Sequence, residues 1–484
     1  MASSVKQICL GIDLGTTNSC IAVLNNLPVN FSTNPEVIAN MDGRRTTPSV
    51  VSFQDSQLLV GKQALDAVST KPENTFYCIK RFIGTRITDR KIRKFRKNLT
   101  YRIYKDEKKP EKIVLKVSTE RYNEGKNEKG ELIPLIIEPE EISAQVLSYL
   151  KQIAYSNSPN PTNKVVVTVP ANFNEYQKRA TKDAAIIAGL DPVDVISEPT
   201  AACINYACLT GKQETERKVI VYDFGGGTLD VSLVRIKGGN FTVIATAGDS
   251  HCGGSDIDQF LLENAIDNFR ETYGIDLTRS ELYDTDKYAR ERAILLMECE
   301  KAKITLSSLK SAIINIANFV KKDDKMIDYK TVLYQSAIEN YIEDCKDKLL
   351  GPIRDVIEFA KIEKTEISSV ILVGGSCNIP AIRKIVTEEI GLEPYLPKNP
   401  DEAIAIGASI YGAYCLKKED PEFVDLNIKD FGDLTITDVT PMDIGIGLRN
   451  NIIDKRISRN SKIPSEGKWQ KYRKNIIEDE ENII

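Results

Sequence analysis

The hydrophobic pattern along the chain is clearest between Lys218 and Val234, which reads KVIVYDFGGGTLDVSLV. The apolar, β-branched run from Val219 to Tyr222 predicts a buried strand, and this strand ends on Asp223. Apolar alternation resumes directly after the three glycines and Thr228, so the glycines predict a hairpin turn and not the start of a helix. Glycines at such a turn let backbone amides approach phosphate oxygens. An ordinary glycine-rich hairpin is the competing interpretation of this stretch taken alone.

The same pattern occurs a second time near the N-terminus. The apolar run from Gln7 to Ile12 predicts a strand that ends on Asp13, and Gly15, Thr16 and Thr17 follow before a second strand begins at Cys20. Two strand–acid–glycine–threonine hairpins in one chain suggest two related halves. If the two turns face each other, they can hold a phosphate chain from both sides. A nucleotide phosphate is therefore the leading hypothesis for the ligand.

The remaining pattern alternates between strands and helices, which is typical of α/β architecture. Phe76, Ile79 and Phe82 recur at helical spacing, which predicts a helix over 73–83, and residues 100 to 137 predict an antiparallel edge sheet. Further strands are expected at 164–169, 241–246 and 369–373, and near the C-terminus at 444–448 and 452–453. Further helices are expected at 139–154, 177–188, 256–273, 288–305 and 332–349. One more helix is expected directly after Glu198, another from the residues after Pro352 to Ala360, and a last one that opens at 399–402 and runs to Tyr414.

Three positions outside the hairpins have competing interpretations. Lys80 lies beside the apolar stripe of the helix expected over 73–83, where a lysine is usually a solvated surface residue. Glu198 opens an alanine-rich helix, so it is either a helix cap or an acid that orients a water or a hydrated magnesium ion. The turn at Gly374 and Gly375 follows a buried strand and is either a steric necessity or a seat for a sugar or base.

Composition narrows the class of protein. The 484 residues are too many for one simple core and predict two to four compact units. A net charge of -4 gives no electrostatic reason to expect nucleic acid or an anionic membrane as a partner, and a single histidine excludes a multi-histidine metal site. The ten cysteines form no CxxC pair, and the N-terminal residues do not read as a signal peptide. A cytoplasmic location is therefore expected.

Six motifs give the sequence a family resemblance. They are GIDLGTTNSC, VTVPANFN, SEPTAA, YDFGGGTLDVSL, LVGGS and NPDEAIAIGA. In this order and spacing they resemble the 70-kilodalton heat-shock protein family, the DnaK-type chaperones. The resemblance implies a two-lobed, actin-like (ribonuclease H-like) ATPase domain with duplicated halves over residues 1–420, a linker over 421–438, and a short β-type remnant of a truncated substrate-binding domain over 439–484.

The resemblance also implies site residues and cofactors, namely ATP or ADP with Mg²⁺, K⁺ being left open. Lys80 matches the lysine that positions the attacking water, and Glu198 matches the acid that senses the nucleotide. The implied metal-proximal acids are Asp13, Asp223 and Asp230. The implied phosphate-binding residues are Gly15, Thr16, Thr17, Gly225, Gly226, Gly227 and Thr228. The implied nucleoside-binding residues are Glu300, Lys303, Ser307, Gly374, Gly375, Ser376 and Asp401.

Four positions depart from the family pattern. Ile304 and Asn378 stand where the family has two arginines that stack on adenine, which predicts weaker nucleotide binding by about 1–4 kcal/mol at roughly 0.5–2 kcal/mol per contact. Asp194 replaces an arginine that meets the J-domain cochaperone, which puts that partner in question. Lys178 stands where an arginine is usual beside Pro170.

Two hypotheses about function follow. In the first, the chain is an ATP-hydrolysing chaperone that acts on unfolded or nascent proteins through partner chaperones and a nucleotide-exchange factor. In the second, it is a nucleotide-regulated cochaperone or scaffold with little turnover and no peptide cleft of its own. A sugar kinase on the same fold fits poorly, because all six motifs follow the chaperone versions.

Overall fold

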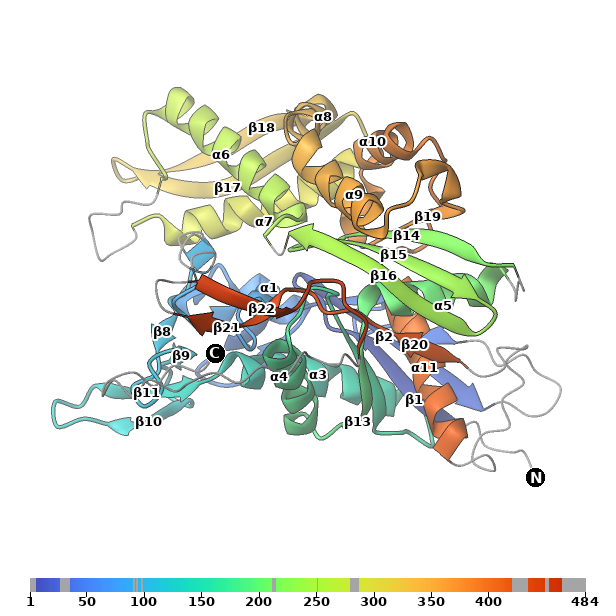
Figure 1. Ribbon diagram of the computed structural model, residues 1–484. Helices are drawn as coiled ribbons and strands as arrows, with labels where there is room; N and C mark the ends of the chain where they lie inside the picture. The colour runs from blue at the N-terminus through green and yellow to red at the C-terminus, as the bar shows by residue number, and fades with distance from the viewer. Residues whose placement is uncertain are drawn as a thin grey trace.

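Two α/β lobes face each other in the computed structural model, which describes residues 6–26, 35–89, 92, 95–96, 99–210, 215–249, 251–278, 287–419, 434–448 and 452–463 (Figure 1). Lobe I is built on the sheet that contains β1 (Lys6–Asp13), and lobe II on the sheet that contains β14 (Arg217–Phe224). Strands alternate with covering helices in both lobes, as the hydrophobic pattern predicts.

The lobe I sheet has the order β13-β12-β1-β2-β3, with β4 paired to β2. Its strands are β1, β2 (Asn18–Asn26), β3 (Glu36–Val37), β4 (Thr46–Pro48), β12 (Lys164–Val169) and β13 (Asp191–Ser197). β1 and β2 form the predicted antiparallel hairpin, and β12 pairs in parallel with β1 so that Asp13 lies beside Thr168. Helices α3 (Pro139–Ser156) and α4 (Glu175–Ile187) belong to the same lobe.

The lobe II sheet repeats this arrangement with the order β19-β14-β15-β16-β20. β14 and β15 (Leu229–Lys237) form the second predicted hairpin, in which Asp223 lies opposite Asp230. β19 (Ser369–Val373) pairs in parallel with β14, as β12 does with β1. The two halves therefore share an antiparallel hairpin with a parallel strand beside its first strand, which agrees with the predicted duplication.

Two helices of small residues, α5 (Glu198–Thr210) and α11 (Ala403–Glu419), lie between the two sheets (Figure 1). A Cβ at Gly407 would lie 1.8 Å from the Ala201 carbonyl oxygen, and one at Gly11 would lie 2.2 Å from the Ala405 carbonyl oxygen. Only glycine, which has no Cβ, fits at these two points of contact between α11 and its neighbours α5 and β1. The alanine-rich face of α5 thus packs closely, as the sequence indicated, and helps to fix the two hairpins relative to each other.

Smaller elements complete both lobes. Lobe I adds the sheet β6-β5-β7, the predicted antiparallel sheet β10-β11-β9-β8 and helix α1. Their bounds are β5 (Val51–Phe53), β6 (Leu58–Val60), α1 (Lys62–Ala67), β7 (Thr75–Phe76), β8 (Tyr104–Lys105), β9 (Ile113–Val117), β10 (Asn123–Lys126) and β11 (Leu132–Ile137). Lobe II adds β16 (Asn240–Asp249), α6 (Gly254–Tyr273), α7 (Ala289–Leu306), β17 (Ser311–Lys322), β18 (Lys325–Tyr334), α8 (Gln335–Asp344), α9 (Lys346–Ala360) and α10 (Pro380–Ile390).

Two predicted helices are wrong. The segment 73–83 is not a helix but two short 3₁₀ turns, Pro72–Asn74 and Ile79–Arg81, on either side of β7. Cys78 lies between them with φ of 57°, and this left-handed backbone breaks the helical period while the apolar side chains stay buried. The helix expected over 332–349 is instead the end of β18, α8 and the start of α9, which continues through Pro352 to Ala360. Pairing with β17 kept Val332 in a strand, a long-range effect that local spacing does not reveal.

The C-terminal residues that the structure describes are docked on lobe II. β20 (Thr435–Thr437) adds to the sheet beside β16, and β21 (Ile444–Leu448) pairs with β22 (Ile452–Ile457). Beyond this hairpin, the Arg459 guanidinium donates to the Thr246 carbonyl oxygen at 2.9 Å. Residues 421–433 of the expected linker and the tail 464–484 lie outside the described residues.

All ten cysteines are free thiols, in agreement with the absence of CxxC pairs. Among the described residues, no helix is both long and apolar enough to cross a membrane.

Candidate functional site

The two glycine–threonine turns meet at the cleft between the lobes. A Cβ at Gly226 would lie 2.1 Å from Thr17 Oγ1, and one at Gly227 would lie 2.6 Å from Thr16 Cγ2. The threonines of lobe I therefore lie directly against the glycines of lobe II, which only residues without a Cβ permit. The two turns therefore face each other, which is the arrangement that the predicted clamp requires.

Hydrogen bonds donated by backbone amides hold both turns in shape. The Gly225 amide donates to the Thr228 carbonyl oxygen at 3.0 Å, and the Gly15 amide donates to Ser19 Oγ at 3.2 Å. The carbonyl oxygens of Gly225 and Gly226 in turn accept from the amides of Gly254 and Ser255 at the start of α6. These contacts use the first free amides of α6, so the helix N-terminus is tied to the glycine turn.

Lys80 and Glu198 form a buried ion pair at the floor of the cleft. Lys80 Nζ donates to Glu198 Oε1 at 2.5 Å, and the two side chains are only 8% and 5% exposed. The interpretation of Lys80 as a solvated surface residue is therefore wrong, because the 3₁₀ turn that replaces the expected helix directs it inward. Glu198 opens α5 as predicted, and its contact with Lys80 favours the interpretation as a site acid over that of a simple cap.

Three aspartates gather around this pair, and burial raises the pKa of each. Burial and the nearby Glu198 raise the pKa of Asp13 to about 7, and the same two causes raise the pKa of Asp230 to about 7. The pKa of Asp223 is also raised well above its usual range by burial, Glu198 and Asp230. The positive charge of Lys80 opposes all three upward pKa shifts. Burial by itself would lower the pKa of Lys80, but the negative charges of Glu198 and Asp13 outweigh it, so the pKa of Lys80 is raised. Four carboxylates thus share one cation.

The excess of carboxylates fits a bound divalent cation. Asp230 is 1% exposed, and neither of its carboxylate oxygens receives a hydrogen bond of good geometry from the described residues, although the Thr228 hydroxyl helps to lower its pKa. No three His, Cys, Asp or Glu side chains in the described part of the chain are placed to ligate one ion together. Mg²⁺ commonly keeps several waters and binds one or two carboxylates plus substrate phosphates. The residues therefore suit a hydrated Mg²⁺ shared with a phosphate ligand better than a cage made by protein alone.

The residues expected on the nucleoside side lie around the same turn. Lys303 Nζ donates to Asp258 Oδ2 at 2.7 Å and to the Gly254 carbonyl oxygen at 3.2 Å. Ser376 Oγ donates to the Gly225 carbonyl oxygen at 2.9 Å, which joins the Gly374–Ser376 turn to the second hairpin. A Cβ at Gly375 would lie 2.7 Å from Asp401 Oδ1, so this acid lies against the turn. Glu300 and Ser307 belong to the same stretch as Lys303 at the end of α7, and Ser307 Oγ donates to the Lys303 carbonyl oxygen.

Two of the departures from the family pattern are at the surface. Ile304 is 62% exposed, and Asn378 is exposed with its amide donating to the Gly375 carbonyl oxygen at 3.1 Å. Asp194, by contrast, is not a free surface charge. Its carboxylate accepts from the Tyr411 hydroxyl at 2.9 Å and from the Val195 amide at 2.8 Å.

Arg81 is a cleft residue that the sequence did not reveal. It is 7% exposed, and its guanidinium crosses from lobe I to donate to the Gly227 carbonyl oxygen at 2.8 Å and to Ser255 Oγ at 3.2 Å. It also lies over the Phe95 ring, 4.2 Å from the centroid. In the sequence, only the position of Arg81 next to Lys80 pointed to a role in the cleft. Local sequence does not show which of two neighbouring cations reaches the other lobe.

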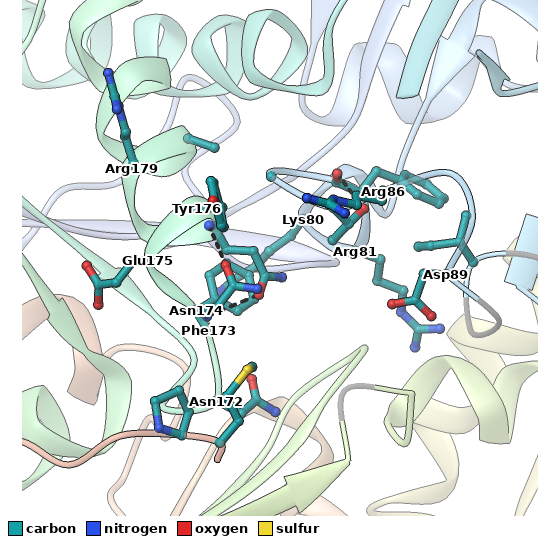
Figure 2. A pocket seen from close by; sticks show the side chains of 18 of the residues that line it. Lys80, Arg81, Arg86, Asp89, Asn172, Phe173, Asn174, Glu175, Tyr176 and Arg179 are labelled. Atoms are coloured by element: carbon teal, nitrogen blue, oxygen red, sulfur yellow. Dashed lines mark hydrogen bonds between the residues drawn. The ribbon is translucent and has the colours of Figure 1, made fainter. Parts of the chain in front are cut away.

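A large cavity of about 1560 Å³ extends from Thr16, Lys80 and Thr228 toward the docked C-terminal segment at 440–445. Figure 2 shows Lys80 and Arg81 at its centre, with Arg86 and Asp89 on one side and the start of α4, from Asn174 to Arg179, on the other. Among the cleft residues, Thr16, Lys80, Arg81 and Thr228 line this cavity.

Fold and site together define a two-lobed protein in which two glycine–threonine turns meet between duplicated halves. The Hsp70 protein family matches residues 9–480. The chain is 36% identical over 466 residues to a ribosome-associated molecular chaperone of Zygosaccharomyces rouxii, covering 96% of this chain and 70% of the relative. It is 36% identical over 457 residues to the chaperone protein dnaK of Cyanidium caldarium, covering 94% and 66%, and 37% identical over 458 residues to a heat shock 70 kDa protein of Neurospora crassa, covering 94% and 65%.

The chain therefore belongs to the Hsp70 family, a class of ATP-dependent molecular chaperones with an actin-like, two-lobed ATPase fold. It spans about two thirds of the length of these relatives.

Proposed function

We propose that this chain binds MgATP in the cleft between its lobes and hydrolyses it slowly. The observation that carries the proposal is the contact between the two glycine–threonine turns, with the Lys80–Glu198 pair and three aspartates beside it. Phosphoryl transfer needs positioning and charge neutralisation more than covalent help from the protein. Mg²⁺ would supply charge neutralisation at the phosphates, and Asp13, Asp223 and Asp230 are the residues that would hold it through its waters.

Each residue of the site then has a defined task. The amides of the two turns bind phosphate oxygens, except those of Gly15 and Gly225, which are already hydrogen-bonded. Lys80 orients the attacking water while Glu198 holds the lysine in place. Glu300, Lys303, Ser307, Gly375, Ser376 and Asp401 hold the nucleoside, and K⁺ near Asp230 is a further cation for this acidic pocket. Residues 1–420 form the ATPase domain in this proposal, 421–438 the linker and 439–484 a β-type segment that follows it.

The output of the cycle is assistance to protein folding. Relatives of this chain are described as ribosome-associated chaperones, so we propose nascent or unfolded proteins as clients, reached in the cytoplasm with partner chaperones and a nucleotide-exchange factor. The engagement of Asp194 with Tyr411 argues against an ordinary J-domain contact at that position.

A second candidate is a nucleotide-regulated cochaperone or scaffold that binds ATP with little turnover. Ile304 and Asn378 favour this candidate, because they stand where the family has two arginines that stack on the adenine base. Single-turnover hydrolysis of ATP, with and without Mg²⁺, separates the two. Hydrolysis that needs Mg²⁺ and disappears in Lys80→Met supports the enzyme, whereas binding of ATP without turnover supports the scaffold.

A further inference from the structure

The ribbon formed by β17 and β18 in lobe II carries apolar side chains on both of its faces. Its inner face packs on α6, where the Tyr329 hydroxyl donates to the Ala265 carbonyl oxygen at 2.9 Å. Its outer face carries Ile313, Met326 and Val332, which are exposed. Ile313 and Val332 lie directly opposite each other in the ladder, so they form a joint apolar surface. Strands that are apolar on both faces are typically covered on both faces, which makes the outer side of this ribbon a candidate interface.

The edge of β18 that faces away from β17 directs backbone groups to the outside. Among the described residues this sheet has two strands, and Figure 1 shows β17 between β18 and α7. The Gln335 amide donates to the Lys310 carbonyl oxygen at 3.0 Å, in the register of the ladder. Because hydrogen-bonded positions alternate in an antiparallel pair, the amides and carbonyl oxygens of Lys330 and Val332 point to the other edge. Such an edge can pair with a strand from another chain.

The exposed side chains along this edge are complementary to the same sequence read in reverse. Met326, Asp328, Lys330 and Val332 are exposed and read apolar, acidic, basic, apolar. If a second β18 lies antiparallel around a two-fold axis at Tyr329, Asp328 of one copy lies opposite Lys330 of the other. Met326 of each copy then lies opposite Val332 of the other. Opposite charges and apolar pairs across two strands stabilise their pairing, whereas like charges destabilise it.

The two charged residues are available for this contact. Neither Lys330 nor Asp328 forms an ion pair with another residue in the described part of the chain. Asp328 Oδ1 accepts from the Asn318 amide at 2.7 Å, and the Asp328 carbonyl oxygen accepts from the Tyr273 hydroxyl at 3.1 Å. Carboxylate and carbonyl oxygens have two lone pairs each, so both groups of Asp328 can accept a further hydrogen bond from a second copy.

We propose that a second copy of this chain pairs with the outer edge of β18, so that two β17–β18 ribbons form one four-stranded antiparallel sheet across a two-fold axis. Because both copies use the same surface, the assembly ends at a dimer. The paired stretch 326–332 is much shorter than the roughly 20–30 residues per side of a standard interface, so the dimer is weak and reversible. This inference does not depend on ATP binding or hydrolysis and stands or falls independently of the proposed function.

Sedimentation equilibrium of the full chain, over a concentration series into the high-micromolar range, measures the dissociation constant of the dimer. Lys330→Asp and Asp328→Lys each place like charges opposite each other twice per dimer, and each should weaken the dimer at least about fivefold. The double exchange D328K/K330D restores opposite charges and should return the constant to within about twofold of the native value. Lys129→Asp, at an exposed lysine between β10 and β11, is the matched control and should leave the constant unchanged.

Val332→Pro tests the edge itself. The Val332 amide does not donate to β17, so a proline there is compatible with the ribbon but removes a donor that the second copy needs. This variant should stay monomeric while its melting temperature remains close to that of the native chain; melting temperatures also establish that the charge variants are folded. A native chain that is monomeric over the whole series, assemblies larger than a dimer, a dimer that persists in Val332→Pro, or a double exchange that is no tighter than the single changes would overturn the proposal.

Discussion

Replacing Lys80 by methionine removes the cation that the described cleft acids share and keeps most of the length of the side chain. The partner Glu198 is then left buried, 5% exposed, within a group of four carboxylates. Removing one partner of a buried ion pair costs roughly 3–5 kcal/mol, and we expect the lower end, because the acids can take up protons. Removing one group that stabilises a developing charge slows catalysis by about 100- to 1,000-fold. We therefore expect at least about a 100-fold slower single turnover of MgATP in a variant that still folds.

The stability of this variant should also depend on pH. Without Lys80, the largest effect that opposes the raised pKa values of the cleft carboxyls is lost, so the folded protein holds these protons more tightly than the unfolded chain does. Protonation then favours the folded state, and the stability of the variant relative to the native chain should recover as the pH falls from 8 toward 6. Thermal unfolding at several pH values measures this difference.

Lys218→Met is the matched control. Lys218 pairs with Glu366 at 2.5 Å at the opposite end of β14 from Asp223, and the two side chains are 22% and 45% exposed. Its loss should cost about 0–1 kcal/mol and should not change turnover. If Lys80→Met hydrolyses ATP within about twofold of the native rate, or if Lys218→Met is slowed to the same extent, the role assigned to Lys80 is refuted.

Three further changes test other parts of the structure. Gly226→Ala places a methyl group against Thr17 and should weaken ATP binding at least tenfold in equilibrium titrations, with partial rescue by Thr17→Ala; unchanged affinity would show that the two turns are not held in contact. Ile304→Arg restores a cation at the exposed position where the adenine base is expected to stack. One stacked contact of roughly 0.5–2 kcal/mol should tighten ATP binding about two- to thirty-fold. Unchanged affinity would mean that the adenine base binds elsewhere. The pKa of Glu389 is lowered first of all by Arg354, so the stability that this pair contributes is present above pH 4.5 and is lost as the pH falls through the lowered pKa. Glu389→Gln should lower the melting temperature at pH 7, and this difference should shrink as the pH falls below 4.5; a difference that stays constant as the pH falls would contradict the ion-pair explanation.

Much of the fold could be predicted from the sequence because its main signals are local. Both hairpins and the strands at 164–169 and 369–373 follow directly from apolar runs that end at an acid, a proline or a glycine. The predictions failed where pairing between distant segments decided the local structure. β17 and β18 pair with each other and keep Val332 in a strand, and the left-handed Cys78 interrupts an apolar spacing that reads as helical.

The candidate site, like the fold, could be predicted only in part from the sequence. The sequence by itself determined the glycines, threonines and acids of the two turns, because a close backbone approach requires glycine and each motif is contiguous. Only the tertiary structure decided that Lys80 is buried against Glu198 and that Arg81 crosses to lobe II. The physical reason is that burial and charge pairing depend on which segments meet across the cleft. Lys80 and Glu198 are 118 residues apart, and no local pattern records that they become neighbours.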